Sequence, residues 1–219
     1  MYRERASWVP GAVVWTRTTP PSGATHRILP DGCMDLIWVD GEIIVAGPDT
    51  TAHLTSPRPG ARLVGLRFAP GTAPAVLGVP ARELRDTRLP LSQLWPASLV
   101  RRLAEAPDPA RTLESVAARS TPDPLAAPVT ARLRAGVSVA ATAAWVGLSE
   151  RQLHRRCQDL FGYGPKTLAR VLRMERALAL ARAGTPFAVV AARVGYADQA
   201  HLARDVKALA GVPLSRLAG

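Results

Sequence analysis

The sequence has few cysteines and no long hydrophobic run. Cys33 and Cys157 are the only two cysteines among 219 residues, and they lie far apart in different kinds of segment. A disulfide framework therefore does not fit this chain, and a cysteine-rich zinc site is impossible. The four histidines also lack the spacing of metal ligands. No segment approaches the ~20 apolar residues that span a bilayer, and the charged start MYRERASWVPG is unlike a secretory signal, so we expect a cytoplasmic protein without a membrane partner.

Sequence motifs of catalysis are also missing. The chain contains no nucleophile elbow, no phosphate-binding loop and no HExxH motif. An alkyl-accepting DNA-repair enzyme would need a four-cysteine zinc site, whereas the N-terminal half holds a single cysteine. With 47% hydrophobic residues, the chain can still bury ordinary cores. We therefore predict a globular protein that is not an enzyme and uses no metal or cofactor.

Negative charge is scarce in the C-terminal part of the chain. The whole sequence carries 28 Lys and Arg against 17 Asp and Glu, which gives a net charge of +11. Residues 1–125 are nearly balanced, with 14 basic and 12 acidic residues, whereas residues 126–219 hold 14 basic and 5 acidic residues. A surplus of this kind indicates a polyanionic partner or an acidic membrane surface, and its position assigns that partner to the C-terminal part.

The two parts also differ in their residue pattern. Runs rich in Val, Ile, Trp and Thr predict strands at 11–19, 25–29, 34–47 and 62–68, with a hairpin turn at Asp40-Gly41. Short helices are predicted after Phe68, at 72–78, 80–86, 97–105 and 109–119. We therefore predict an α+β fold with a small β-sheet or barrel-like domain and trailing helices at 1–120, a proline-rich linker at 121–128, and an all-α domain at 129–219.

The all-α part contains one phrase twice. WVGLSERQLHRRC stands at 145–157, and RVGYADQAHLARDV stands at 193–206. In each copy an alanine lies four residues before a glycine, as in a helix-turn-helix unit, where a small residue lies at the helix contact and a glycine reverses the backbone. Ser149 with Gln152 predicts a capping box at the start of the next helix, and Asp198 predicts the corresponding cap in the second copy.

A long helix is predicted between the two copies. Pro165 suits a first helical position and Gly184 a terminating one, with roughly nineteen residues of strong helix formers between them. Such a helix spans nearly 30 Å at ~1.5 Å per residue, close to the ~34 Å that separates successive major-groove faces of DNA. The C-terminal domain is therefore predicted to hold two helix-turn-helix subdomains joined by a long helix.

This half resembles the DNA-binding domain of the AraC/XylS family of bacterial transcription regulators. The matching residues are VGLSERQLHRRCQDLFGYGPKTLARVLRMERAL and VAARVGYADQAHLARDVKALAGVPLS, which cover roughly 140–215. Val206 departs from the pattern, because the family usually has Phe before Lys207. The N-terminal half, with LPDGCMDLIW, GLRFAPG and LPLSQLW, is similar to an uncharacterised sensor-like domain that precedes such DNA-binding domains. The resemblance implies a sequence-specific transcription regulator whose partner is double-stranded DNA, with a small-molecule effector, RNA polymerase and a second copy of the chain as further candidate partners.

Helical geometry and the resemblance together select the residues expected to contact DNA. In the first copy Leu153 and Cys157 fall on the packing face, while the outward face is polar. In the second copy Ala200 and Ala203 point outward and can offer only methyl contacts, so we expect the first copy to dominate base readout. Other basic residues, including Lys166, Arg170 and Arg173, are expected at phosphate or in solvent. The expected DNA contacts are Arg151, Gln152, His154, Arg155, Gln158, Gln199, Ala200, His201, Arg204 and Lys207.

The N-terminal half leaves several interpretations open. An effector pocket could be lined by Trp15, Trp38, Phe68 and Trp95, although aromatic residues at strand positions are more often part of a core. Cys33, near His26, Asp31 and Asp35, suggests a thiol or electrophile sensor or a metal site, whereas Pro30-Asp31-Gly32 also has the composition of a plain turn. A sequence-indifferent architectural DNA-binding protein is the other alternative function, and the two reading faces argue against it.

Overall fold

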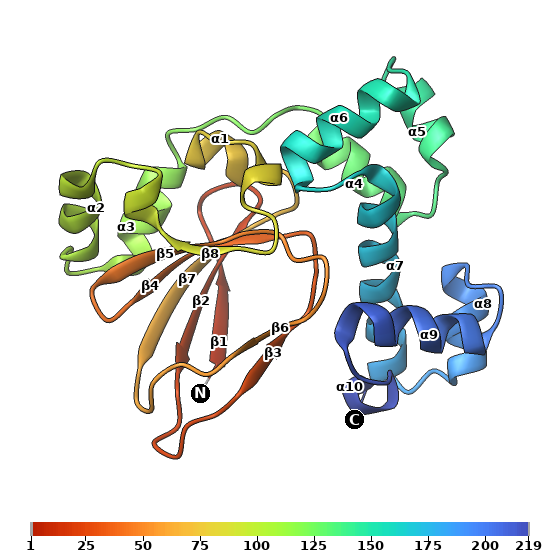
Figure 1. Ribbon diagram of the computed structural model, residues 1–219, viewed down its shortest axis with the longest axis horizontal. Coiled ribbons are helices and arrows are strands. Elements are labelled where there is room, and N and C mark those ends of the chain that lie inside the picture. The colour runs from red at the N-terminus through yellow and green to blue at the C-terminus, as the bar shows by residue number, and fades with distance from the viewer. Residues whose placement is uncertain (1, 219) are drawn as a thin grey trace.

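The computed structural model describes residues 2–218 and has a β-rich N-terminal domain followed by a helical C-terminal domain (Figure 1). This architecture confirms the predicted fold class. The strands are β1 (Tyr2–Ala6), β2 (Ala12–Thr18), β3 (His26–Ile28), β4 (Met34–Val39), β5 (Glu42–Ala46), β6 (His53–Thr55), β7 (Arg62–Phe68) and β8 (Arg88–Pro90).

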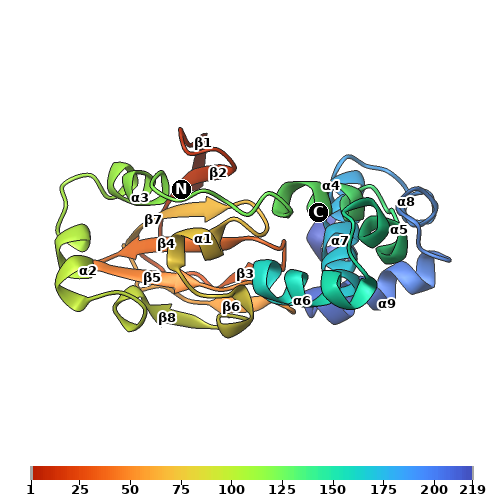
Figure 2. The same ribbon diagram turned by 90° about the horizontal axis from the view of Figure 1, so that it is seen from above.

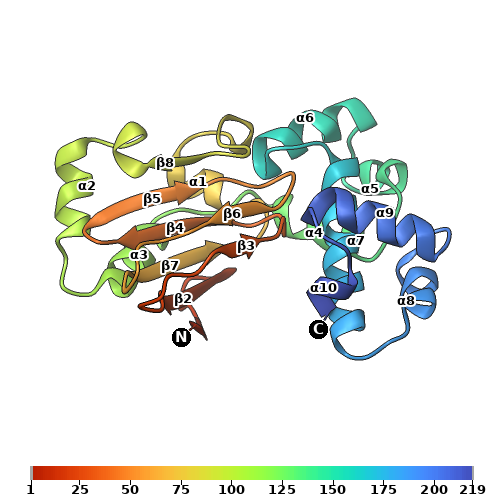
Figure 3. The ribbon, with the colours of Figure 1, turned by 60° about the horizontal axis from the view of Figure 1, so that its bottom comes forward.

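Six strands form one antiparallel sheet in the order β1-β2-β7-β4-β5-β8. Figure 3 shows the order from β2 to β8 across the sheet. β3 and β6 pair with each other as a separate ladder. The hairpin between β4 and β5 turns at Asp40 and Gly41, as predicted, and both residues have positive φ, 51° and 83°. A two-residue type I′ turn requires positive φ at both central positions, which explains the Asp-Gly pair.

Short helices cover one face of the sheet. They are α1 (Ala73–Leu77), α2 (Ala97–Ala104) and α3 (Pro109–Ala117), with the 3-10 turns η1 (Ala81–Glu83) and η2 (Leu91–Gln93). Val14, Leu36 and Leu66, from neighbouring strands, project into the core beneath these helices. On the opposite face, Trp15 packs with Ala61 and Leu63 in a smaller cluster. The alternation of side chains along each strand therefore gives the sheet two different apolar faces.

Several predicted elements need correction. The helix predicted at 80–86 is wrong, because only η1 forms there: Leu84 leaves helical geometry at φ −110° and its side chain enters the core. β1, β6 and β8 were not among the predicted strands. The β1 sequence YRERA has no apolar alternation and is exposed along its whole length, while β6 and β8 are three residues long. Strands of that kind leave too weak a pattern to be detected.

The C-terminal domain consists of helices around a single core. They are α4 (Ala126–Arg134), α5 (Val139–Trp145), α6 (Glu150–Phe161), α7 (Pro165–Arg182), α8 (Phe187–Val194), α9 (Gln199–Ala210) and α10 (Ser215–Ala218). α7 lies at the centre, with Leu168, Val171 and Leu172 fully buried. α4 begins inside the predicted linker 121–128, because Pro128 is tolerated in the first turn, where a backbone N–H has no helical partner. No helix within residues 2–218 is both long and apolar enough to cross a membrane.

Candidate nucleic-acid interface

The first helix-turn-helix unit is formed by α5 and α6. Gly147, at φ 71°, lies in the turn between them, a backbone conformation that favours glycine. Ser149 then caps α6: its Oγ accepts from the Gln152 backbone N–H at 3.2 Å, and Gln152 Oε1 accepts from the Ser149 backbone N–H at 2.8 Å. This confirms the predicted capping box. The cap satisfies backbone donors at the helix start and fixes where the exposed face of α6 begins.

The second unit, α8 and α9, repeats this construction. Gly195 ends α8 in the left-handed region at φ 85°. Asp198 caps α9, as predicted, because its carboxylate accepts from the His201 backbone N–H at 2.6 Å. Leu202 and Val206 are fully buried, so the smaller Val206 still fills its place in the core. Both units therefore have the same local architecture, with a glycine turn followed by a capped helix.

The two capped helices lie on the same side of α7. In the view along α7, both α6 and α9 lie below it, while α4 lies above it (Figure 2). α7 has 18 residues, which corresponds to about 27 Å of helix. Its buried side chains anchor both units in one core. The arrangement thus presents two exposed helices, separated along a rigid connecting helix, toward one surface.

Most of the predicted DNA contacts lie on this surface. Arg151 and Arg155 of α6 are exposed and have no partner in the described structure, and Gln158 is partly exposed beside them. On α9 the exposed side chains alternate with buried ones, as the helical pattern predicts. They are Gln199, Ala200, Ala203, Arg204, Lys207 and Ala208.

Three predicted contacts also have a local structural role. Gln152 uses its side-chain oxygen in the capping box. The His154 ring lies against Gly164, where an added Cβ would come within 2.5 Å of its Cε1. The His201 ring meets the Tyr196 ring edge-on at 5.1 Å, and its Nδ1 accepts from the Ala197 N–H at 3.4 Å. These side chains therefore help to shape the turns and the α6–α7 junction, in addition to any contact with DNA.

A buried carboxylate cluster in the second unit was not predicted from the sequence. Asp205, only 9% exposed, accepts from Arg170 Nε and from Tyr196 Oη at 3.0 Å, and Arg173 Nη2 lies 3.5 Å away. Burial and Asp205 together raise the pKa of Tyr196 to about 12, so its hydroxyl remains a donor. The one signal in the sequence is an acidic residue at a buried position of α9, between Leu202 and Leu209.

The N-terminal domain contacts the C-terminal ends of both exposed helices. Two backbone carbonyls in the last turn of α9 are satisfied from that domain: Arg27 Nη1 donates to Ala210 O at 2.8 Å, and the Ala52 N–H donates to Leu209 O at 2.7 Å. At α6, Asp159 pairs with Arg82 of η1. The contacts leave the N-terminal halves of α6 and α9 exposed and fix their opposite ends.

The segment between α3 and α4 also contacts α6. Arg156, one of the basic residues of that helix, pairs with Asp123 in the segment between α3 and α4. Gly71, at φ 83°, lies so close to Phe161 at the end of α6 and to Ala126 that a Cβ would come within 2.6 Å and 2.9 Å of them. The two domains therefore meet in a close-packed contact around the end of α6.

The predicted effector pocket does not form from the four aromatic residues. Phe68 is buried in the core beneath the helices, Trp38 and Trp95 are partly buried and pack against that core, and Trp15 lies on the opposite face of the sheet. Each indole N–H is bonded inside the domain, since Trp38 donates to Ala104 O at 2.8 Å, Trp95 to Leu77 O at 3.1 Å, and Trp15 to an Asp35 oxygen at 2.5 Å. Phe68 and Trp15 are therefore buried residues of two separate clusters, and Trp38 and Trp95 pack at the edge of the core, so the four side chains do not line one pocket.

Cys33 does not have the surroundings of a reactive thiol. Burial raises its pKa well above the ordinary value, and the nearby carboxylates of Asp31 and Asp35 raise it further. A thiol sensor reacts as the thiolate, which this environment disfavours. Asp31 Oδ1 accepts from the Cys33 backbone N–H at 2.8 Å, as in a turn. Within residues 2–218, no cluster of three or more His, Cys, Asp or Glu residues could hold a metal ion.

Comparisons with known proteins agree with this geometry. A family profile described as "Helix-turn-helix domain" matches residues 142–218, and one described as "Domain of unknown function (DUF6597)" matches residues 11–90. No curated protein matches the chain with significant similarity.

A solved structure shares the fold over nearly the whole chain, and others are similar to its C-terminal part. A variant of apo ToxT from Vibrio cholerae is 11% identical, covers 99% of this chain and 98% of its own, and has a TM-score of 0.51. An AraC-type transcriptional regulator from Chromobacterium violaceum is 20% identical over 43% of this chain and 89% of its own, with a TM-score of 0.41. The C-terminal domain of AraT from Geobacillus stearothermophilus is 24% identical over 44% of this chain and 87% of its own, with a TM-score of 0.38. The chain therefore combines a helix-turn-helix domain at residues 142–218 with a domain of unknown function at residues 11–90.

Proposed function

We propose that the protein is a sequence-specific DNA-binding transcription regulator that reads two successive major-groove segments. One observation carries this proposal: two capped helices present exposed faces on the same side of α7. A recognition helix reads base edges from its N-terminal half, and in α6 and α9 that half is exposed. The surplus of basic residues in the same domain supports a polyanionic partner.

Selection of bound sequences from a random duplex pool tests this function. The full-length protein should enrich a site with two half-sites about one helical turn apart. A double variant, Arg151→Ala with Arg155→Ala, should lose the enriched bases of one half-site, whereas Arg101→Ala with Arg102→Ala, on the distant helix α2, should enrich the same site as the wild type. If the wild type binds DNA but enriches no sequence, it is a sequence-indifferent architectural protein.

We further propose that the two helices contribute unequally to specificity. α6 offers Arg151 and Arg155, each able to bond bidentately to guanine, whereas α9 offers mainly Ala200, Ala203 and Arg204. A bidentate pair discriminates by ~1–3 kcal/mol, or roughly 5- to 150-fold. Arg155→Ala should therefore reduce the ratio of specific to scrambled binding more than Arg204→Ala does. Equal losses in the two variants would contradict unequal readout.

The N-terminal domain is proposed to modulate this readout, with a small-molecule effector as its input. Support comes from the bonds that join it to the ends of α9 and α6, through Arg27 and Arg82. A change in the docking of the domain would alter the relative orientation of the two helices. Arg27→Ala should change the affinity for the selected site, while Arg58→Ala, which removes an exposed arginine paired with Asp40, should not. An unchanged affinity in Arg27→Ala would show that the two domains act independently.

A second copy of the chain and RNA polymerase are the other proposed partners. β1 lies at the edge of the sheet, and its residues are exposed, which leaves backbone groups available for another strand. Sedimentation of the full-length protein, alone and with the selected duplex, tests dimerisation. Transcription from a promoter that contains the selected site, with purified polymerase, tests the second partner and distinguishes activation from repression.

A further inference from the structure

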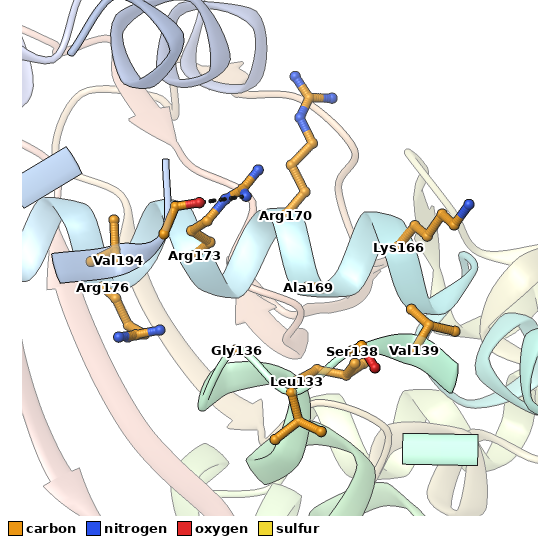
Figure 4. A pocket seen from close by; sticks show the side chains of 12 residues that line it. Leu133, Gly136, Ser138, Val139, Lys166, Ala169, Arg170, Arg173, Arg176 and Val194 are labelled. Carbon is orange, nitrogen blue, oxygen red and sulfur yellow. Dashed lines mark hydrogen bonds between the residues drawn. The ribbon is translucent and has the colours of Figure 1, made fainter. Parts of the chain in front are cut away.

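A basic groove lies between the two helix-turn-helix units, outside both recognition faces. It has a volume of about 320 Å³ and is formed by the turn between α4 and α5, by one side of α7, and by the end of α8 at Gly195 (Figure 4). Its charged side chains are Lys166, Arg170, Arg173 and Arg176, all from α7, and none of the residues that line it is acidic. The groove is therefore a cationic surface that belongs to neither unit alone.

The positive charge of this groove exceeds the negative charge that faces it. Arg170 and Arg173 share one carboxylate, that of Asp205. Arg176 donates to two neutral backbone carbonyls, Arg134 O at 2.9 Å and Arg193 O at 3.5 Å. The Lys166 ammonium is exposed and has no bonding partner within residues 2–218. Four cations with one carboxylate leave about three uncompensated charges, which favours binding of a polyanion.

Two of these guanidinium groups are held in fixed positions. Arg173 lies over the Tyr196 ring at 4.2 Å and donates to Gly195 O at 3.4 Å, in addition to its contact with Asp205. Arg170 is held by the same carboxylate. Side chains that are already ordered lose less conformational entropy on binding an anion than free surface side chains do. The cationic side chains of the groove are thus preorganised to bind a ligand with phosphate groups.

The position of the groove, between the two helix-turn-helix units, indicates that these phosphate groups belong to DNA. If α6 and α9 occupy successive major grooves, the DNA that faces the middle of α7 is the minor groove between them, bordered by the sugar-phosphate backbone. Lys166 and Arg176 are ten residues apart, or about 15 Å along α7, and one DNA strand carries one phosphate per about 3.4 Å of its axis. The row of cations therefore spans roughly four phosphates of one strand.

We propose that this groove binds the DNA backbone at the minor groove between the two half-sites, with Lys166, Arg170 and Arg173 on phosphate oxygens. This inference rests on the proposed DNA-binding function. The groove contributes affinity that is independent of sequence and sets the distance between the two recognition helices on the duplex.

Salt dependence of binding tests the proposal. Lys166→Gln is the informative variant, because Lys166 makes no structural bond, and Arg101→Gln on α2 is the matched control for lost charge. Loss of one phosphate contact should reduce the slope of log K against log salt by ~0.9. Between 50 and 200 mM salt, the affinity of Lys166→Gln should then fall about 3- to 4-fold less than that of the wild type, on specific and scrambled duplexes alike. Lys166→Arg keeps the positive charge and should show the same slope of log K against log salt as the wild type.

Three outcomes would overturn the inference. An unchanged slope in Lys166→Gln would place the groove away from the backbone, and a loss confined to the specific duplex would make Lys166 a base-reading residue. Saturable binding of inorganic tripolyphosphate that Lys166→Gln abolishes, together with an unchanged DNA slope, would assign the groove to a free phosphate compound. By contrast, failure of the wild type to enrich any sequence would refute the proposed function itself, whatever the slope of the variant.

Discussion

Replacing Asp205 by asparagine should destabilise the protein measurably. Asn has nearly the same shape and can still accept from Tyr196, but it removes the negative charge that faces Arg170 and Arg173. Removing one partner of a fully buried ion pair costs ~3–5 kcal/mol. The two arginine side chains here are 38% and 29% exposed, so water can solvate part of their charge, and we expect about 2 kcal/mol.

Thermal denaturation followed by circular dichroism provides the assay. For a chain of this size, about 2 kcal/mol corresponds to a decrease of roughly 4–8 °C in Tm. Tyr196→Phe removes a single neutral hydrogen bond and should cost about 1 kcal/mol. Asp40→Asn removes an exposed pair with Arg58 and serves as the control, with a change of at most about 1 kcal/mol. If Asp205→Asn unfolds at the same temperature as Asp40→Asn, the cluster does not stabilise the second unit.

Other predictions concern the N-terminal domain and its contact with the helices. Burial raises the pKa of Asp35 to about 6 from 3.8, so the folded state binds the proton more tightly than the unfolded state does. The free energy of unfolding should therefore fall by up to ~3 kcal/mol as the pH rises from 4 to 7. In denaturation titrations, Asp35→Asn should remove this dependence on pH. Cys33 should react with iodoacetamide at pH 7.5 far more slowly than free cysteine, and equal rates by mass spectrometry would contradict its raised pKa. In Gly71→Ala, the backbone at φ 83° should be strained and the added methyl group should collide with Phe161. The contact between the two domains should then weaken, and proteolysis at 118–125 should be faster. Unchanged cleavage would argue against a close-packed contact.

Local sequence patterns determined most of the C-terminal domain. Each helix-turn-helix unit is specified within about fifteen residues by a small residue, a turn glycine and a capping side chain, and Ser149, Gln152 and Asp198 cap their helices as predicted. The exposed and buried faces of α6 and α9 likewise follow from helical periodicity. The same is true of the Asp40-Gly41 hairpin, because the positive φ values of its turn are a local requirement.

Only the tertiary structure revealed the contacts between the two domains and between distant segments of the chain. The bonds from Arg27 and Arg82 to the ends of α9 and α6 join segments that are far apart in sequence, and no local pattern encodes them. The pairing of Arg170 with Asp205 is also non-local, because the partners are 35 positions apart in the sequence. The groove along α7 exists because packing brings two turns beside one basic helix face. Periodicity and capping depend on neighbours within a few residues, whereas these contacts depend on how complete elements pack.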